Sequence, residues 1–379
     1  MAGIYIHIPF CKRKCHYCNF FSLASQKMKE PFLKALRIEM ELTRDYLAGE
    51  DVNTVYFGGG TPSLFSPGEY LMTPPPDPLP KKGGGERREV TLELNPEDVT
   101  ESYVEELKDT RFNRFSLGVQ SFADDDLAYL NRSHSAAQAI HAVKLLQKAG
   151  YENISIDLIY GIPTSCGERW KKNLEIAFSL DVPHISAYAL TVEQRTPLAW
   201  LINKQRYAPV NDEDQISQFR QVMQMVREHG FQQYEISNFS KPGRHAVHNT
   251  NYWNGVSYLG LGPSAHSYNG NSRRWNISNL TEYIAAMDKG ELRYEEEILT
   301  PVQKYNEYVM TSLRTIWGCS LEKIISHFGF RISDFFRNGA SRFVKQGLLM
   351  ELSGVYFLTD EGKLFADRIA GELFLLNKV

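Results

Sequence analysis

The chain has 379 residues, of which 42% are hydrophobic and 23% charged, and its formal net charge is -3. This composition is typical of a globular protein with a large core, and roughly 100–200 residues per domain suggests two domains. The nearly balanced charge argues against a strongly basic nucleic-acid binder, and no apolar run is long enough to cross a membrane. The N-terminal apolar stretch is too short for a signal peptide, so we expect a cytoplasmic protein without an integral membrane segment.

Strands and helices alternate through the first half of the chain. Buried strands are expected at residues 3–9, 52–57, 90–94, 114–119, 154–160 and 185–190. Amphipathic helices are expected at residues 29–48, 100–108, 136–149, 169–180 and 211–230. Six such βα units predict a parallel sheet with right-handed crossovers, and they are too few for a closed eight-stranded barrel. We therefore predict an α/β fold with a partial barrel over residues 1–235.

The remainder of the chain has a different composition. Residues 236–300 are rich in Asn, Tyr, Trp and Gly, and we expect an irregular segment that closes the barrel. Residues 301–379 are expected to form a hairpin around Ser353-Gly354 and three helices, at residues 302–315, 320–327 and 333–346. This α+β pattern resembles a winged-helix-like module, and its charge favours a packing appendage over a nucleic-acid reader. The Pro- and Gly-rich residues 74–85 predict a surface loop with no assigned function.

Five cysteines occur in the chain, and three of them, Cys11, Cys15 and Cys18, fall within eight residues. An odd number with this clustering is a poor disulfide framework, and in a reducing compartment clustered thiols favour metal binding. Cys166 and Cys319 are isolated, and we interpret them as incidental thiols.

The motif Cys11-x-x-x-Cys15-x-x-Cys18 directly follows the first expected strand. Thiolates are soft ligands suited to iron–sulfur clusters and to zinc. Three thiolates leave the fourth iron of a [4Fe–4S] cube open to a small bidentate ligand, which favours the cluster. Zinc is the alternative, but a closed zinc site takes four protein ligands, and His16 is awkwardly placed within the loop to supply the fourth.

The glycine run Gly58-Gly59-Gly60-Thr61-Pro62 ends the second expected strand. Glycine lets the backbone approach a ligand closely, although a run of three by itself usually marks only a turn. Beside a loop of three cysteines at the mouth of a βα barrel, the run indicates a ligand site.

These motifs together resemble a known superfamily. The runs YIHIPFCKRKCHYC and YFGGGTP are similar to those of radical S-adenosylmethionine (SAM) proteins. The further runs LELNPED, GVQSF, LNRSH and DLIYGIP resemble the coproporphyrinogen-III-oxidase-like branch of that superfamily. The resemblance extends over nearly the whole chain. It implies a three-quarter (β/α)6 barrel, a [4Fe–4S] cluster with an open iron, and SAM that is cleaved reductively.

The resemblance also implies a role for each matching residue. Tyr5 and Tyr17 would flank SAM and the cluster, and Gly59, Gly60 and Thr61 would bind the methionyl amino end.

Four polar residues would complete the SAM site by the same resemblance. Glu93 would meet the SAM amino group or ribose, Gln120 the adenosine, Arg132 the carboxylate and Asp157 the ribose hydroxyls. A carboxylate and a guanidinium at opposite ends suit a zwitterionic amino acid. Taken singly, the two acids could be structural and Arg132 a surface cation, although buried charges rarely lack a partner.

A second constellation, His248-Asn249-Thr250-Asn251-Tyr252-Trp253, lies in the segment expected to be irregular. A histidine near aromatic residues is usually a packing residue, but the pattern HNxxYW resembles the signature of the HemW haem chaperones within this branch. That resemblance implies that His248 ligates haem iron or fixes the haem-binding segment, with Tyr252 as a second ligand or hydrogen-bond partner. The role of His266 is ambiguous, and His7 is expected to be structural.

Two departures separate this chain from the oxidases of the branch. Their cluster motif continues to a fourth cysteine at the position of Phe20, and they carry an extension before the first strand. The leading hypothesis is therefore a haem chaperone of porphyrin metabolism, with haem as cargo and with acceptor haemoproteins and an electron donor as partners. Peripheral contact with membrane haemoproteins is compatible with it.

Two other functions are alternatives to the chaperone hypothesis. The main alternative is an oxygen-independent coproporphyrinogen III dehydrogenase, in which a 5′-deoxyadenosyl radical drives decarboxylation of propionate side chains. Radical SAM modification of RNA is disfavoured by the charge, and we expect no nucleic-acid partner. We expect the scaffold to bind and cleave SAM without dehydrogenase activity.

Overall fold

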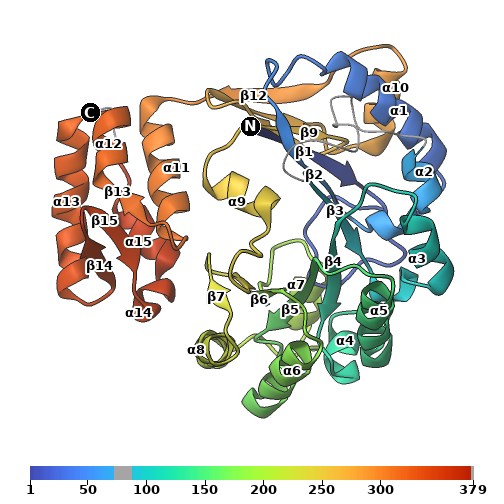
Figure 1. Ribbon diagram of the computed structural model, residues 1–379, viewed down its shortest axis with the longest axis horizontal. Helices are drawn as coiled ribbons and strands as arrows, with labels where there is room; N and C mark the ends of the chain where they lie inside the picture. Colours follow the sequence, from blue (N-terminus) through green and yellow to red (C-terminus); the bar gives the residue numbers. More distant parts are fainter. Residues whose placement is uncertain (72–87, 377–379) are drawn as a thin grey trace.

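The computed structural model describes residues 1–71 and 88–376, and its first half is the partial barrel expected from the sequence (Figure 1). Six parallel strands lie in chain order in one sheet. They are β1 (Ala2–Ile8), β2 (Val52–Gly59), β3 (Glu89–Leu94), β4 (Arg114–Gln120), β5 (Ile154–Tyr160) and β6 (His184–Ala189). The helices among and after them are α1 (Lys29–Leu42), α2 (Pro67–Leu71), α3 (Glu101–Leu107), α4 (Asp124–Tyr129), α5 (Ala136–Lys148), α6 (Gly167–Ser179), α7 (Pro197–Asn203) and α8 (Asp212–Glu228).

The side chains of β1 show how the sheet separates its core from the barrel interior. Ile4, Ile6 and Ile8 are buried in the large hydrophobic core that β1 shares with α1. Tyr5 and His7 alternate with them and line a cavity on the other face of the strand. Because all six strands run in the same direction, the loops that follow them meet at one end of the barrel.

Two predictions concern the segments that link these elements. The helix predicted at residues 29–48 ends earlier, because α1 stops at Leu42 and turns follow. The backbone of Ala48 and Gly49 has φ of 49° and 78°, a left-handed conformation that a helix cannot continue through. The Pro- and Gly-rich residues 74–85 lie outside the described residues.

The expectation that residues 236–300 are irregular is wrong. The short strand β7 (Gln232–Gln233) precedes this region. The region itself contains β8 (Asn238–Ser240), α9 (Val247–Trp253), β9 (Tyr258–Leu261), β10 (His266–Tyr268), β11 (Ser272–Asn276), α10 (Leu280–Met287) and β12 (Tyr294–Ile298). The strand β8 pairs with β6, and β9 pairs with β1, so the segment extends both edges of the barrel sheet. Strands this short show little periodicity, and their pairing depends on partners far away in the sequence.

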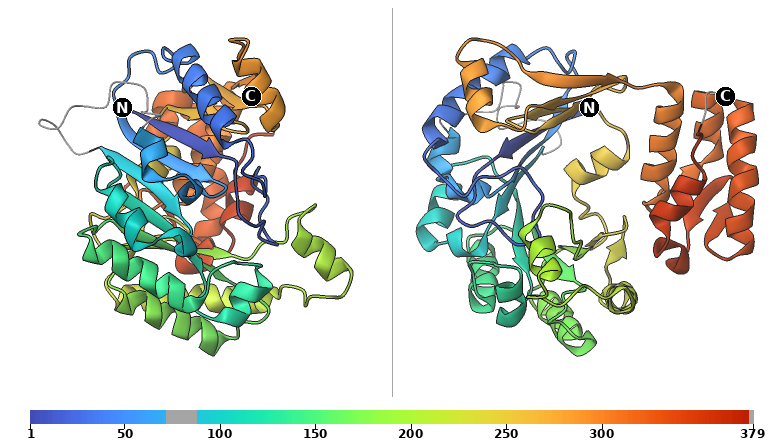
Figure 2. Two further views of the ribbon diagram at one scale, coloured as in Figure 1. Left: turned by 90° about the vertical axis from the view of Figure 1, so that its right-hand side faces the viewer. Right: turned by 180° about the vertical axis from the view of Figure 1, so that it is seen from behind.

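The C-terminal part has the three helices and the hairpin that the sequence predicts. It contains α11 (Pro301–Leu313), β13 (Cys319–Ser320), α12 (Leu321–Phe328), α13 (Phe330–Lys345), β14 (Leu349–Leu352), β15 (Val355–Leu358), α14 (Asp360–Lys363) and α15 (Ala366–Glu372). We call these residues, 301–376, the C-terminal module. The module has its own hydrophobic core and stands beside the open side of the barrel (Figures 1 and 2).

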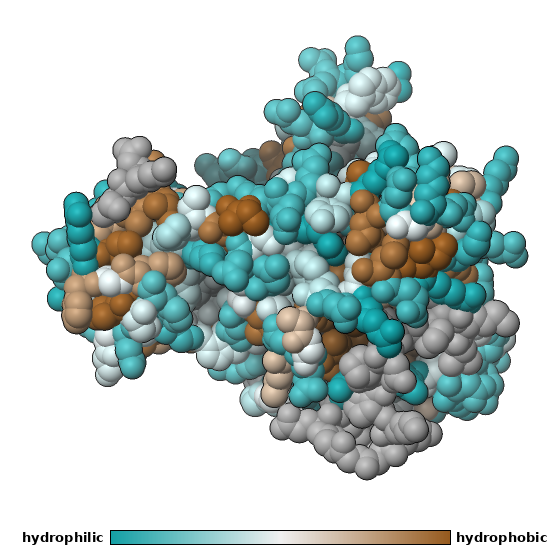
Figure 3. Space-filling view, turned by 90° about the horizontal axis from the view of Figure 1, so that it is seen from above, coloured by the Kyte–Doolittle hydropathy of each residue, from teal (hydrophilic) through white to brown (hydrophobic). Residues whose placement is uncertain are grey.

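Seen from above, the C-terminal module is a separate lobe with apolar residues on its surface (Figure 3). Phe330 is 74% exposed and Leu352 is 61% exposed. Within the described ranges, none of the helices combines the length and the apolar character that crossing a lipid bilayer requires.

Candidate functional site

The three clustered cysteines lie in a loop between β1 and α1. The backbone N–H of Cys11 donates to the carbonyl of Leu23 (3.0 Å), which closes the two ends of the loop. In the middle of the loop, the backbone N–H of His16 donates to Leu130 (3.1 Å), and its Nδ1 lies 3.0 Å from the carbonyl of Tyr129. His16 therefore faces α4, and it is not among the residues that line the cavity beside the cysteines.

That cavity has a volume of about 610 Å³ and lies inside the barrel. Cys11, Cys15 and Cys18 line it, together with eight of the residues assigned to SAM. These eight are Tyr17, Gly59, Gly60, Thr61, Glu93, Gln120, Arg132 and Asp157. We call it the first cavity.

The chemistry of the thiols suits a cluster. Burial raises the pKa of the Cys11 and Cys18 thiols, so a positive centre is needed to hold them as thiolates. In residues 1–71 and 88–376, no three His, Cys, Asp or Glu side chains are close enough together to hold one metal ion. Three thiolates on a four-iron cube bind three different irons, so they need not converge on one point.

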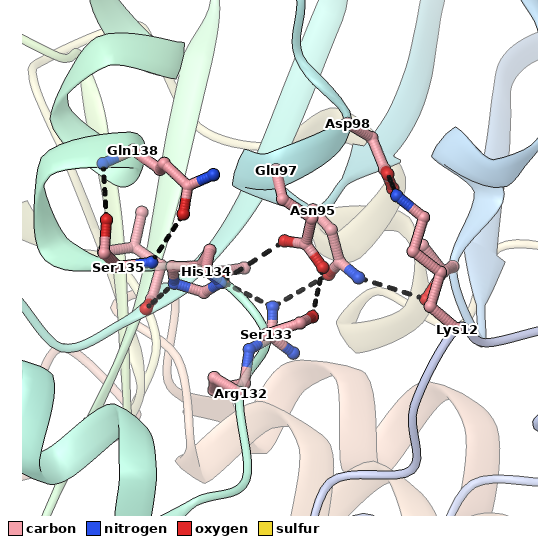
Figure 4. Close-up of polar contacts among 12 residues, drawn as sticks. Lys12, Asn95, Glu97, Asp98, Arg132, Ser133, His134, Ser135 and Gln138 are labelled. Atoms are coloured by element: carbon pink, nitrogen blue, oxygen red, sulfur yellow. Dashed lines mark hydrogen bonds and ion pairs between the residues drawn. The ribbon is translucent and has the colours of Figure 1, made fainter.

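Arg132 connects the cluster loop with the wall of the first cavity, and Figure 4 shows its contact with Asn95 in that wall. One guanidinium nitrogen lies 3.4 Å from the Cys15 sulfur, and the other donates to Asn95 Oδ1 and to the Gly118 carbonyl, both at 2.8 Å. Burial lowers the pKa of Arg132, but Tyr17 and Cys15 outweigh it and raise the pKa above its ordinary value. Its buried Nε has no hydrogen-bond partner within the described chain, so a donor is left for a carboxylate in this cavity.

The residues around Arg132 explain the runs LNPED and LNRSH as one hydrogen-bonded network (Figure 4). Glu97 accepts a hydrogen bond from Ser133 and lies 3.5 Å from His134 Nδ1. Burial raises the pKa of Glu97, but the bonds from His134 and Ser133 are stronger and bring it to about 2. Asp98 forms an ion pair with Lys12 of the cluster loop, so the network fixes that loop to the end of β3.

Two carboxyl groups face the first cavity, Glu93 from β3 and Asp157 from β5. Burial raises the pKa of Glu93 to about 7 and that of Asp157 to about 6. Glu93 accepts hydrogen bonds from the Tyr56 hydroxyl (2.8 Å) and from the Gly59 backbone N–H (3.1 Å). Asp157 accepts one from Ser116 (3.2 Å). Both groups can therefore accept hydrogen bonds from a ligand more strongly once they ionise.

The glycine run lets two parts of the chain cross closely. A Cβ on Gly60 would lie 2.5 Å from the carbonyl oxygen of Phe10, and Gly60 N–H donates to Ile8 (2.7 Å). The run therefore passes directly against the start of the cluster loop, and Thr61 contacts the Cys11 thiol. On the opposite wall, Gln120 has φ of 67°, an uncommon backbone conformation that is often found at functional sites.

The structure does not bring Tyr5 or Tyr252 to the first cavity. Both line a different cavity of about 1000 Å³, between the open edge of the barrel and the C-terminal module. We call it the second cavity. His248 is among the lining residues of neither cavity.

The HNxxYW run forms α9, and its side chains point in different directions. Asn249 lines the first cavity, whereas Tyr252 and Trp253 line the second. His248 is 2% exposed and contacts residues at the amino ends of strands: its Nδ1 lies 2.8 Å from Thr54 Oγ1 of β2, and its ring lies against Gly3 of β1. Its Nε2 lies 2.9 Å from the Tyr252 hydroxyl. Both ring nitrogens are thus engaged inside the protein.

Burial and a carboxylate fix the start of α9. Glu89 accepts hydrogen bonds from the backbone N–H groups of Val247 (3.0 Å) and His248 (2.9 Å), two donors that a helix leaves unpaired. Burial lowers the pKa of His248 to about 3, so the ring is neutral near pH 7. In this structure His248 anchors α9, while Tyr252 and Trp253 of the same helix line the second cavity.

Several lining residues of the first cavity were not identified from the sequence. Asn95 joins Arg132 and Thr61, and Ser116 and Ser186 both contact Asp157. A detectable signal was present, because each serine lies between two apolar residues of its strand. The other two cysteines lie elsewhere: Cys166 is exposed, and Cys319 is buried in the C-terminal module.

Comparisons with known proteins agree with this geometry. Residues 5–177 match the model of the radical SAM superfamily. The chain is 32% identical to the heme chaperone HemW of Bacillus subtilis, covering 98% of both chains. It is 31% identical to HemW of Escherichia coli, again covering 98% of both. Among solved structures, coproporphyrinogen III oxidase (HemN) from Escherichia coli superposes with a TM-score of 0.83 at 20% identity, over 99% of this chain and 90% of that chain.

The structural likeness to HemN supports the fold, whereas the sequence similarity to the HemW proteins extends from one end of the chain to the other. On this evidence the chain belongs to the HemW heme chaperone family within the radical SAM superfamily.

Proposed function

We propose that this protein is a haem chaperone that binds haem and passes it to haem-requiring proteins. The observation that carries the proposal is the full-length similarity to HemW proteins, which covers 98% of the chain and of the Bacillus subtilis relative. Phe20, where the oxidases have a further cysteine, supports the same proposal. The acceptor haemoproteins and an electron donor would be its partners.

The proposal includes a [4Fe–4S] cluster on Cys11, Cys15 and Cys18, and SAM in the first cavity. When bound, the cluster would supply the electron that cleaves SAM reductively. The residues present are suited to these groups: three thiols face one cavity, and the free Nε of Arg132 offers a donor to a carboxylate. Glu93 and Asp157 offer acceptors to hydroxyl and amino groups.

The proposal assigns a role to each of the three predicted regions of the chain. Residues 1–235 would hold the cluster and SAM, and residues 236–300 would complete the barrel edges and carry the HNxxYW helix. Residues 301–379 would form one wall of a cargo site. We also propose a cytoplasmic location, because all five cysteines are free thiols, which suits a reducing compartment.

A coproporphyrinogen III dehydrogenase is the second candidate, and the fold likeness to HemN favours it. Such an enzyme would need the same cluster and SAM site, so these features do not distinguish the two functions. Decarboxylation of the propionate side chains of coproporphyrinogen III, with consumption of SAM, would distinguish them.

The experiment is anaerobic reconstitution followed by haem titration and a decarboxylation assay. We expect about four irons and four sulfides per chain, a Soret band on adding haem, and no conversion of coproporphyrinogen. Replacing Cys11, Cys15 or Cys18 by Ala should remove the cluster. Cys166→Ala is the matched control, because that thiol is exposed and lines neither cavity.

Two results would contradict the chaperone proposal. One is haem binding no stronger than that of an unrelated protein. The other is steady release of CO2 from coproporphyrinogen with SAM consumption, which would assign the protein to the dehydrogenases.

A further inference from the structure

The second cavity is large enough for a ligand and is built from two separate parts of the molecule. Its volume is about 1000 Å³, at the upper end of the range of about 300–1,000 Å³ typical of ligand sites. One wall comes from β1, α9, β9 and β10 of the barrel, and the other from α11, β13 and α12 of the C-terminal module. A movement of the module relative to the barrel would therefore widen it, which suits a cargo that must be released.

The walls of the second cavity are aromatic on both sides. On the barrel side, the rings of Tyr252 and Tyr258 meet edge to face at 4.6 Å, and Tyr268 follows at 6.2 Å from Tyr258. On the module side, Tyr308 and Phe328 lie 6.4 Å apart. Facing aromatic walls favour a flat, apolar ring system that can stack between them.

The charged groups around the second cavity are mostly positive. Its charged lining side chains are Arg273, Lys304, Lys323 and Glu307, a formal net charge of +2 with the histidines neutral. Arg273 is paired with Glu307 at 2.9 Å, and no ion pair of either lysine is found in the described part of the chain. Two uncompensated cations match a ligand with two carboxylates.

Three imidazoles line the second cavity, and their surroundings differ. His7 is 4% exposed and has both nitrogens engaged, by the Tyr5 hydroxyl (3.1 Å) and the Phe21 carbonyl (2.8 Å). His327 points its Nδ1 to the Lys323 carbonyl of its own helix (2.9 Å). His266 packs beside Trp275, and within residues 1–71 and 88–376 its ring makes no side-chain hydrogen bond.

Burial and Arg273 lower the pKa of His266, so the ring is neutral near pH 7. A neutral imidazole with no other partner can ligate iron. His266 also contributes to lowering the pKa of His7, and the Nε2 of His7 lies 2.8 Å from the carbonyl of Phe21 in the cluster loop.

The two cavities adjoin at the cluster loop. Asn19 and Phe20, which directly follow Cys18, line both of them. Phe20 is 66% exposed, and an exposed phenylalanine between two cavities provides an apolar contact for a ligand in either one. A ligand in the second cavity would therefore lie next to the loop that carries the cluster cysteines.

We infer that the second cavity is the haem site, with His266 as the iron ligand and Lys304 and Lys323 as partners of the two propionates. This inference rests on the proposed function and adds to it the location of the cargo. It differs from the expectation that His248 is the ligand, because His248 lines neither cavity and has both nitrogens engaged.

The test is titration of the cluster-loaded, full-length protein with haemin and, separately, with iron-free protoporphyrin. His266→Ala should shift the Soret band and weaken haemin binding by at least about tenfold. Removing only the hydrogen-bond partner of a metal ligand already lowers metal affinity by about tenfold or more. Protoporphyrin binding should be unchanged in this variant, because it contains no iron to ligate.

The charge contacts are tested by the double variant Lys304→Glu and Lys323→Glu. This double variant should bind both haemin and protoporphyrin with an affinity about fivefold or more below that of the wild type at low salt. The difference in affinity should be smaller at high salt. Lys345→Glu is the matched control on the same module, and His141→Ala is the matched histidine control on α5, since neither residue lines the cavity. We expect wild-type binding in both controls.

The outcomes separate the inference from the function. A wild-type protein that binds no haemin would overturn the proposed function. Two results would overturn the inference alone. One is that His266→Ala binds haemin with wild-type affinity and an unshifted Soret band. The other is that His327→Ala, and not His266→Ala, weakens haemin binding. Equal protoporphyrin binding by the double lysine variant and Lys345→Glu would also overturn it.

Discussion

At the residue scale, the most informative groups are the two acids of the first cavity. Glu93, with a pKa near 7, is largely protonated at pH 5 and half ionised at neutral pH, because burial penalises its charged form. Only the ionised carboxylate offers all its acceptor positions to the donors of SAM and attracts the sulfonium charge. The affinity for SAM should therefore rise as the pH increases from 5 to 7.

We predict that Glu93→Gln makes this pH dependence shallower, leaving the contribution of Asp157, whose pKa is about 6, and weakens SAM binding at pH 7 by about tenfold, the loss of one charge-assisted hydrogen bond. The measurement is equilibrium dialysis of SAM against the cluster-loaded protein at pH 5, 6 and 7. Glu106→Gln, an exposed change on α3, is the control. An equally steep pH dependence in Glu93→Gln would show that another group controls SAM binding.

At the scale of single elements, α9 is fixed by contacts that no neighbour in sequence provides. His248 lies between Thr54 and the Tyr252 hydroxyl, and Glu89 holds the first turn of the helix. Replacing the imidazole ring of His248 leaves a cavity, and the hydroxyls of Thr54 and Tyr252 each lose one hydrogen-bond partner. Each such loss costs about 1–3 kcal/mol.

We predict that His248→Asn lowers the free energy of unfolding by about 2–4 kcal/mol and speeds amide exchange in α9. Urea unfolding and hydrogen exchange measure the two effects. Val247→Ala is the matched control, because Val247 belongs to the same helix and is 41% exposed. If His248 only anchors α9, the Soret maximum of bound haem stays in place even where affinity falls. A displaced maximum would show that the ring leaves Thr54 and Tyr252 to bind iron.

At the scale of the whole molecule, exposed ion pairs connect the C-terminal module to the barrel. Arg220 of α8 lies 2.8 Å from Glu361, and Arg227 lies 2.5 Å from Asp360. Exposed pairs contribute about 0–1 kcal/mol each, and salt weakens them. Each of these two ion pairs is therefore easily broken, and the second cavity lies between the same two parts of the molecule.

We predict that the double variant Arg220→Glu and Arg227→Glu accelerates haem release and increases amide exchange in α14. Haem transfer to apomyoglobin, followed by absorbance, measures the release rate. Arg331→Glu, an exposed change on α13, is the control. Release at the wild-type rate in the double variant would show that these pairs do not control access to the cavity.

The barrel strands, the cluster motif and most of the first cavity could be predicted from the amino-acid sequence. Each barrel strand is a short apolar run that ends in Gly, Pro or a polar residue, a local pattern that needs no tertiary information. The resemblance to radical SAM proteins assigned Gly59, Glu93, Gln120 and Asp157 to one site, and the meeting of the loops after parallel strands at one end of a barrel agrees with that assignment. The three helices and the hairpin of the C-terminal module were predictable for the same reason.

The pairing of the sheet edges, the contacts of His248 and the cavity that Tyr5 and Tyr252 line could not be predicted, because they depend on the packing of segments that are distant in the sequence. The short strands β8 and β9 gain their hydrogen bonds from β6 and β1, which are distant in the sequence. The contact between His248 and Thr54 joins positions 194 residues apart. The second cavity exists only between two separately packed cores, and a sequence pattern cannot report such a junction, because periodicity describes each segment alone.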